Sequence, residues 1–191
     1  MKSVLMSIQP KWCELIASGK KTIEVRKTKP KFETPFKVYI YCTNNNKNRI
    51  GSWLHLYCHS SLVSTDILLE DECYRLNGKV IGEFVCDKIS DARDVGGDEF
   101  YRTSCLSYED WRQYTDGTKN TIWCWHISDL IIYDKPKELN EFYNECEEPD
   151  CDDCPYLRFE NNPNSYEGWC EFNEKIPIKR PPQSWCYVEG E

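Results

Sequence analysis

The sequence predicts an α+β fold, a small mixed β-barrel of about six strands with two or three short flanking helices. Two observations support this class. Segments rich in β-branched and aromatic residues are separated by turn residues, and the helical patterns between them are short. The chain has 191 residues, of which 40% are hydrophobic and 14% aromatic, which suffices for a sizeable core in one large domain.

The expected strands occupy six segments. They lie at residues 3–9, 22–26, 37–42, 78–90, 121–133 and 184–188. Alternation in the second segment predicts that Ile23 and Val25 face one way, while Thr22, Glu24 and Arg26 face the other. Residues 43–52 and 91–104 are polar and predict loops, whereas residues 53–77 have no clear assignment.

Two helices are predicted between these strands. The first covers about residues 10–18, because Pro10 suits a first helical turn and Gly19 suits a helix end. The second follows Ser107, whose side chain can cap a helix together with Asp110 three residues later.

Residues 140–175 lack helical or strand periodicity and carry cysteines in polar sequence. We therefore divide the chain into a barrel, residues 1–139 plus 176–191, and a Cys-rich insertion, residues 140–175, before the last strand. The C-x4-C-x2-C-x15-C spacing suits a closed, structural zinc site. Its predicted ligands are Cys146, Cys151, Cys154 and Cys170. A surface insertion with free thiols and a redox or disulfide role are the alternatives.

A second group of cysteines sits singly in apolar segments and is predicted to fill the core. This group comprises Cys13, Cys42, Cys58, Cys86, Cys105, Cys124 and Cys186. No stretch reaches the roughly 18 apolar residues of a membrane span, and the first residues lack the pattern of a signal peptide. We therefore expect a cytoplasmic protein without a membrane partner and without a disulfide framework.

The formal net charge of −8 conceals an uneven distribution. Residues 1–50 hold 11 Lys and Arg against 3 Glu, a charge of +8, whereas residues 138–153 hold eight acids and no base. The basic part indicates an anionic partner such as RNA, and the acidic 138–153 segment is a candidate surface for a protein partner. A solvated basic face balanced by an acidic one is the alternative.

The most informative segment is residues 7–30, SIQPKWCELIASGKKTIEVRKTKP. It places Lys20 and Lys21 at the entry of a groove, and Glu24 and Arg26, which are two positions apart in a strand, project together. The guanidinium group can hold a phosphate or carbonyl oxygen, and the carboxylate can accept a hydrogen bond from the exocyclic amine of a base. A Lys–Glu pair can also perform acid–base chemistry. A Glu24–Arg26 ion pair that only braces the barrel is the alternative.

The chain resembles the ASCH domain family of the PUA-like superfamily. The resemblance rests on a helix followed by G-x-K-x-x-E-x-R, here Gly19, Lys21, Glu24 and Arg26, and on the segments GKVIGEFVCDKI, WHISDLIIYDKP and RPPQSWCYVEG. It implies a PUA-like (ASCH) β-barrel with a cleft between the first helix and the barrel mouth, and RNA or a modified nucleoside as the ligand. Some ASCH proteins are RNA hydrolases or amidohydrolases of acylated cytidine. Where the latter carry a Thr three residues after the Lys, this chain has Glu24.

Two functions are therefore expected, binding and hydrolysis. In a binding protein, Trp185 or Trp125 would stack on a base. The expected ligand-binding residues are Lys21, Glu24, Arg26, Gln9, Trp12, Trp125, His126 and Trp185. In a small hydrolase that acts on RNA or a modified nucleoside, Lys21 and Glu24 would be the catalytic acid–base pair.

Overall fold

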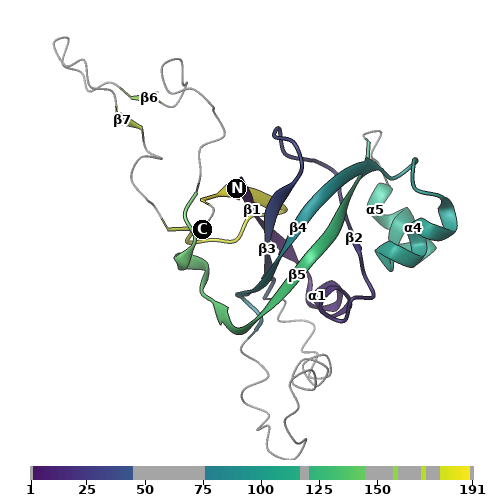
Figure 1. Cartoon of the computed structure of the whole chain (residues 1–191), viewed down its shortest axis with the longest axis horizontal. Coiled ribbons are helices and arrows are strands. Elements are labelled where there is room, and N and C mark those ends of the chain that lie inside the picture. The colour runs from purple at the N-terminus through teal and green to yellow at the C-terminus, as the bar shows by residue number, and fades with distance from the viewer. Residues whose placement is uncertain are drawn as a thin grey trace, which may run out of the picture.

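The computed structural model describes residues 2–44, 76–116, 121–144, 157–158, 169–170 and 177–189. Within them, six strands form one curled sheet with three α-helices around it (Figure 1). The strands are β1 (Ser3–Ile8), β2 (Ile23–Arg26), β3 (Phe36–Cys42), β4 (Lys79–Asp91), β5 (Trp123–Lys137) and β8 (Trp185–Val188). The helices are α1 (Pro10–Ala17), α4 (Gly97–Ser104) and α5 (Tyr108–Thr115). A short pair, β6 (Leu157–Arg158) and β7 (Trp169–Cys170), lies between β5 and β8 in the chain.

The sheet is mixed and has the strand order β2-β5-β4-β3-β1-β8. β1 runs parallel to β3, and the other neighbouring strands are antiparallel. The pairings of β4 with β3 and β5 contain register shifts, which let the long strands bend. The predicted α+β barrel of about six strands is confirmed.

The main core fills the inside of this curl. α1 contributes Cys13 and Ile16, which lie three positions apart on its buried face. Pro10 is the first helical residue as predicted, and Gly19 follows the helix with a φ of 71° that suits glycine. The sheet contributes the remaining buried residues of this core, which are Val4, Met6, Ile8, Phe36, Val38, Ile40, Cys42, Ile81, Phe84, Cys86, Trp125 and Tyr187.

The structure corrects one prediction, because residues 97–104 form α4 where a loop was expected over 91–104. The only large apolar side chain that α4 buries is Phe100, so the helix shows no hydrophobic repeat. Charge stabilises it instead. Asp98 and Glu99 lie in its first turn and Arg102 in its last, which suits the helix dipole.

The second predicted helix is confirmed as α5. The Ser107 side chain accepts a hydrogen bond from the backbone N–H of Asp110, and the Asp110 carboxylate accepts one from the backbone N–H of Ser107. α4 and α5 lie together at one end of the sheet (Figure 1). Their residues Phe100, Trp111 and Tyr114 pack with Ile23 and Val25 of β2 in a separate apolar cluster.

A third apolar cluster covers the opposite side of β1, β3 and β4. It contains Leu5, Tyr39 and Val80 from the sheet, together with Phe142 and Ile178 from outside it. The first residues of the Cys-rich insertion are thereby held against the chain that follows it, and backbone bridges join Tyr143 to Pro177 and Asn144 to Val188. The division between barrel and insertion stays a prediction.

The single cysteines mostly fill cores, as expected. Cys13, Cys42, Cys86 and Cys124 are buried, Cys105 and Cys186 are half-buried, and all six are free thiols. Cys58 lies outside the described residues, as do most of residues 43–52 and 53–77. In the described part of the chain, no helix has the length and apolar character needed to cross a membrane.

Candidate functional site

A pocket of about 400 Å³ opens at the free edge of β2. A volume of this size falls in the range of about 300–1,000 Å³ that is usual for small-molecule sites. The residues that line it come from β1, α1, β2, the chain just after β3, the α4–α5 connection, α5 and the segment before β8. We call it the β2 pocket, and its lining residues are Ser7, Gln9, Trp12, Lys21, Glu24, Val25, Arg26, Thr43, Asn44, Leu106, Tyr114 and Gln183.

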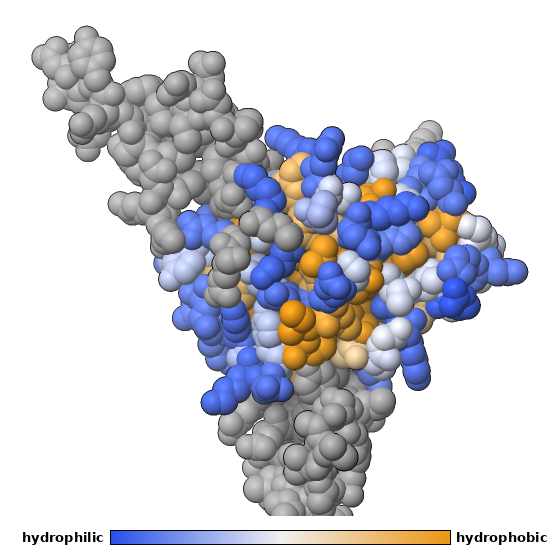
Figure 2. Space-filling model, viewed as in Figure 1, coloured by the Kyte–Doolittle hydropathy of each residue, from blue (hydrophilic) through white to orange (hydrophobic). Residues whose placement is uncertain are grey.

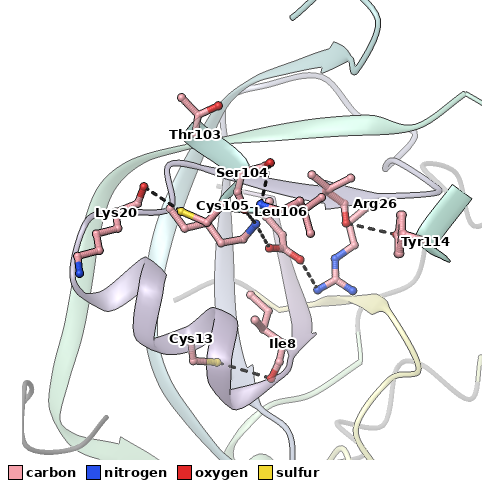
Figure 3. A network of polar contacts seen from close by, with 12 residues as sticks. Ile8, Cys13, Lys20, Arg26, Thr103, Ser104, Cys105, Leu106 and Tyr114 are labelled. Carbon is pink, nitrogen blue, oxygen red and sulfur yellow. Dashed lines mark hydrogen bonds and ion pairs between the residues drawn. The ribbon is translucent and has the colours of Figure 1, made fainter. Parts of the chain in front are cut away.

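Three charged side chains form a continuous chain of contacts in this wall (Figure 3). Lys21 Nζ lies 3.3 Å from Glu24 Oε2, and Arg26 Nη2 lies 3.0 Å from Glu24 Oε1. Their side chains are only 2%, 8% and 11% exposed in the order Lys21, Glu24, Arg26. Two cations against one anion leave a net positive charge where water screens it weakly.

Two backbone carbonyl groups and one serine hydroxyl fix the two cations. Lys21 Nζ donates to the carbonyl oxygen of Ser104 at the end of α4, over 2.7 Å. Arg26 Nη2 donates to the carbonyl oxygen of Ser7 over 2.7 Å, and Arg26 Nη1 donates to Ser184 Oγ over 3.3 Å. The buried Arg26 Nε has no hydrogen-bond partner among the described residues.

Strand alternation explains why Glu24 and Arg26 face the pocket. Ile23 and Val25 belong to the apolar cluster under α4 and α5, so Glu24 and Arg26 lie on the other face of β2, as predicted. The prediction fails for Thr22, which precedes β2 and lines a different cavity. The alternation does not extend to Thr22, because regular strand geometry begins only at Ile23.

The rest of the pocket combines aromatic and amide side chains. Trp12 and Tyr114 contribute ring surface from α1 and α5, and the Tyr114 hydroxyl donates to the carbonyl oxygen of Val25 over 3.3 Å. Burial raises the pKa of Tyr114. Gln9 and Gln183 contribute exposed amides, and no side-chain hydrogen bond of Gln9 caps α1. These groups suit a flat, polar ligand with donors and acceptors on its edge.

Five of the predicted ligand-binding residues meet in the β2 pocket, namely Gln9, Trp12, Lys21, Glu24 and Arg26. Trp125 and Trp185 do not line it. Trp125 is fully buried, with its ring centroid 5.4 Å from that of Phe36 and 5.7 Å from that of Trp185. The half-buried Trp185 donates from Nε1 to Thr28 Oγ1 over 2.9 Å.

His126 lines a second cavity of about 460 Å³, together with Thr22, Lys88 and Thr103. Its Nε2 lies 2.8 Å from Ser90 Oγ. Burial, and then the charge of Lys88, lower the pKa of His126, so the ring is neutral at pH 7. The adjacent Cys124 does not pair with it in a reactive dyad, since burial raises the pKa of this thiol to about 12.

Several lining residues had no signal in the sequence. Ser7, Thr43, Asn44, Leu106 and Gln183 are single polar or apolar residues at element ends and in loops. Only Tyr114 had a usable signal, because it shares a helical face with Trp111 three positions earlier.

The predicted zinc ligands mostly lie outside the described residues, which include none of Cys146, Cys151 and Cys154. Cys170 belongs to β7, where its backbone pairs with that of Leu157. The zinc site therefore stays a prediction. In the acidic 138–153 segment, the Glu138 and Glu141 side chains cap a short 3-10 helix (Leu139–Glu141), and Glu138 forms an ion pair with Lys79.

A curled mixed sheet with a charged pocket beside its first helix and second strand defines a PUA-like domain. The model of the ASCH domain matches residues 6–153, and the chain belongs to the ASCH domain family. The ASCH protein from Zymomonas mobilis has a similar crystal structure, with a TM-score of 0.50, 22% identity and coverage of 73% of this chain and 76% of that chain. A point mutant of that protein gives a TM-score of 0.48 at 20% identity, with coverage of 74% and 78%. At 22% identity, the likeness to the first of these structures shows the fold alone. No curated protein sequence matches the chain significantly.

Proposed function

We propose that this ASCH domain binds RNA or a modified nucleoside, with one base held in the β2 pocket. The observation that carries the proposal is the buried Lys21–Glu24–Arg26 chain of contacts in the pocket wall. It provides cationic donors and one acceptor in a fixed arrangement. A base presents carbonyl oxygens and exocyclic amines along its edge, so it can use both kinds of group.

The pocket composition supports the same ligand. Trp12 and Tyr114 supply aromatic surface, on which a base can stack. Gln9 and Gln183 supply amides that both donate and accept.

Binding is tested by titrating RNA oligonucleotides and modified nucleosides while tryptophan fluorescence is recorded. The diagnostic variant carries Gln9→Ala and Gln183→Ala, since both residues are exposed and the Gln9 side chain does not cap α1. We expect about 10-fold weaker binding, from two lost hydrogen bonds of about 0.5–1.5 kcal/mol each. Gln113→Ala, which lies on α5 away from the pocket lining, is the control and should bind as the wild type does. Equal binding by the diagnostic variant contradicts the proposal.

Hydrolysis of RNA or a modified nucleoside is the second candidate function. Lys21 and Glu24 favour it because they line the pocket 3.3 Å apart, as an acid–base pair requires. Binding is the stronger candidate, since Lys21 Nζ already donates to Ser104 O and contacts Glu24. Mass spectrometry of substrates incubated with the wild type and with Lys21→Met separates the two. A product formed only by the wild type establishes catalysis, provided that the variant retains its fold by circular dichroism.

A further inference from the structure

A short basic segment leads away from the β2 pocket. Residues 27–31, KTKPK, directly follow Arg26, the last residue of β2. Lys27 and Lys29 are exposed, whereas Pro30 is buried. The segment contains no acid. We call residues 27–31 the basic strip.

Two hydrogen bonds to β8 fix this strip. The Trp185 indole Nε1 donates to Thr28 Oγ1 over 2.9 Å. The backbone N–H of Lys31 donates to the Tyr187 hydroxyl over 3.0 Å. An anchored segment loses little conformational freedom when it binds a partner, so more of the interaction energy appears as affinity.

The ammonium groups of the strip lie over aromatic rings. Lys27 Nζ is 5.1 Å from the ring centroid of Tyr114, which itself lines the pocket. Lys29 Nζ is 4.2 Å from the ring centroid of Trp123. Among the described residues, neither lysine has a carboxylate within ion-pair distance. Their charges remain uncompensated, although the whole chain carries a net charge of −8.

This combination matches a nucleic-acid backbone more closely than it matches a free nucleoside. Uncompensated lysines beside aromatic faces are the pattern with which proteins follow a single strand, since phosphates meet the charges and bases stack. A free nucleoside has no phosphate for the strip. A base in a duplex is paired and stacked, and must leave the helix before it can enter a pocket.

We infer that the β2 pocket takes its base from single-stranded RNA, whose phosphates lie on Lys27 and Lys29 of the basic strip. The inference rests on the proposed function, because it uses the same pocket and names the form of its ligand. Lys27 connects the two parts, since it follows the pocket residue Arg26 in the chain and lies over the pocket residue Tyr114.

The test measures fluorescence anisotropy of a labelled single-stranded RNA at several salt concentrations. The strip variant carries Lys27→Ala and Lys29→Ala. Its matched control carries Lys135→Ala and Lys179→Ala, two exposed lysines outside the pocket lining. Loss of two phosphate contacts should reduce the slope of log K against log salt by about 1.4, at about 0.7 per contact on a single strand. We expect at least about 10-fold weaker binding near physiological salt, and no change for the control.

Further measurements separate this inference from the proposed function. If the strip variant keeps the wild-type slope while Gln9→Ala with Gln183→Ala weakens binding, the inference fails and the proposed pocket function stands. If the strip variant alone weakens binding, the pocket function fails. Duplex RNA that binds as tightly as the single strand, or a free nucleoside that competes with equal affinity, also overturns the inference. Circular dichroism confirms that each variant is folded.

Discussion

Arg26 of β2 donates to the carbonyl oxygen of Ser7 in β1 over 2.7 Å, although three strands separate β2 from β1 in the sheet. The sheet thus curls so far that β2 and β1 are joined through the guanidinium group of Arg26. The same side chain forms an ion pair with Glu24 and lines the β2 pocket. One residue therefore both closes the barrel and builds the candidate site.

Replacing Arg26 should destabilise the fold as well as the site. Arg26→Met keeps the bulk of the side chain but leaves Ser7 O without this donor and removes one of the two cations that contact Glu24. We expect the free energy of unfolding in urea to fall by about 2–4 kcal/mol. Lys135→Met, at an exposed site on β5, should change it by less than about 0.5 kcal/mol. An Arg26→Met protein as stable as the wild type would show that the closure is not structural.

The sequence predicted most of this arrangement because the relevant signals are local. Pro10 and Gly19 delimit α1, and alternation along β2 places Glu24 and Arg26 on the pocket face. The missed helix α4 depends on one apolar residue, Phe100, and on tertiary packing. The sequence also could not show that Trp125 is buried behind Trp185, because strand alternation gives the face but not the depth of burial.

Figure 2 shows hydrophobic surface among hydrophilic side chains on the face over β4 and β5. The backbones of these two strands approach each other closely at Gly82. A Cβ atom there would lie 2.4 Å from the carbonyl oxygen of Ile131. Gly82→Ala should therefore push the strands apart and lower the free energy of unfolding by about 1–3 kcal/mol. Gly97→Ala, with open space around the first residue of α4, is the matched control and should be neutral or stabilising by up to about 1 kcal/mol. Equal effects in thermal unfolding would contradict this account.

Cys105 adopts a left-handed conformation, with a φ of 55°, at the end of α4. This turn presents the carbonyl oxygen of Ser104 to Lys21. A glycine accepts the conformation without strain, whereas a β-branched residue does not. We expect Cys105→Gly to keep or increase stability and Cys105→Val to reduce it by about 1–2 kcal/mol, measured by chemical denaturation. Because both variants lack the thiol, the reverse order would show that the left-handed conformation does not limit stability at this position.

Glu83 should make stability depend on pH in the acid range. Burial raises the pKa of Glu83, but the hydrogen bond from Tyr133 and the contact with Lys37 at 2.9 Å outweigh it and hold the pKa below its usual value. Because the folded-state pKa is lowered, the carboxylate stabilises the fold above about pH 4.3, and this contribution disappears as the pH falls through the folded-state pKa.

The measurement compares unfolding free energies of the wild type and Glu83→Gln. The variant should be about 1 kcal/mol less stable near pH 7, and the difference should shrink toward pH 3. Glu33→Gln, an exposed substitution, is the control for the general loss of stability in acid. A difference that stays constant with pH would show that packing, rather than charge, accounts for the effect.

The Cys-rich insertion gives a metal prediction that depends on four residues. Cys146, Cys151, Cys154 and Cys170 have the spacing of a closed zinc site, and β7 pairs Cys170 with Leu157, three positions after Cys154 in the sequence. We expect about one zinc ion per chain in elemental analysis of the purified protein. Cys151→Ser should lose most of it, because a serine hydroxyl is a far weaker ligand than a thiolate, whereas Cys186→Ser in β8 should retain it. A wild-type protein that is folded and free of metal would contradict the zinc site and leave free thiols or a redox or disulfide role as the alternatives.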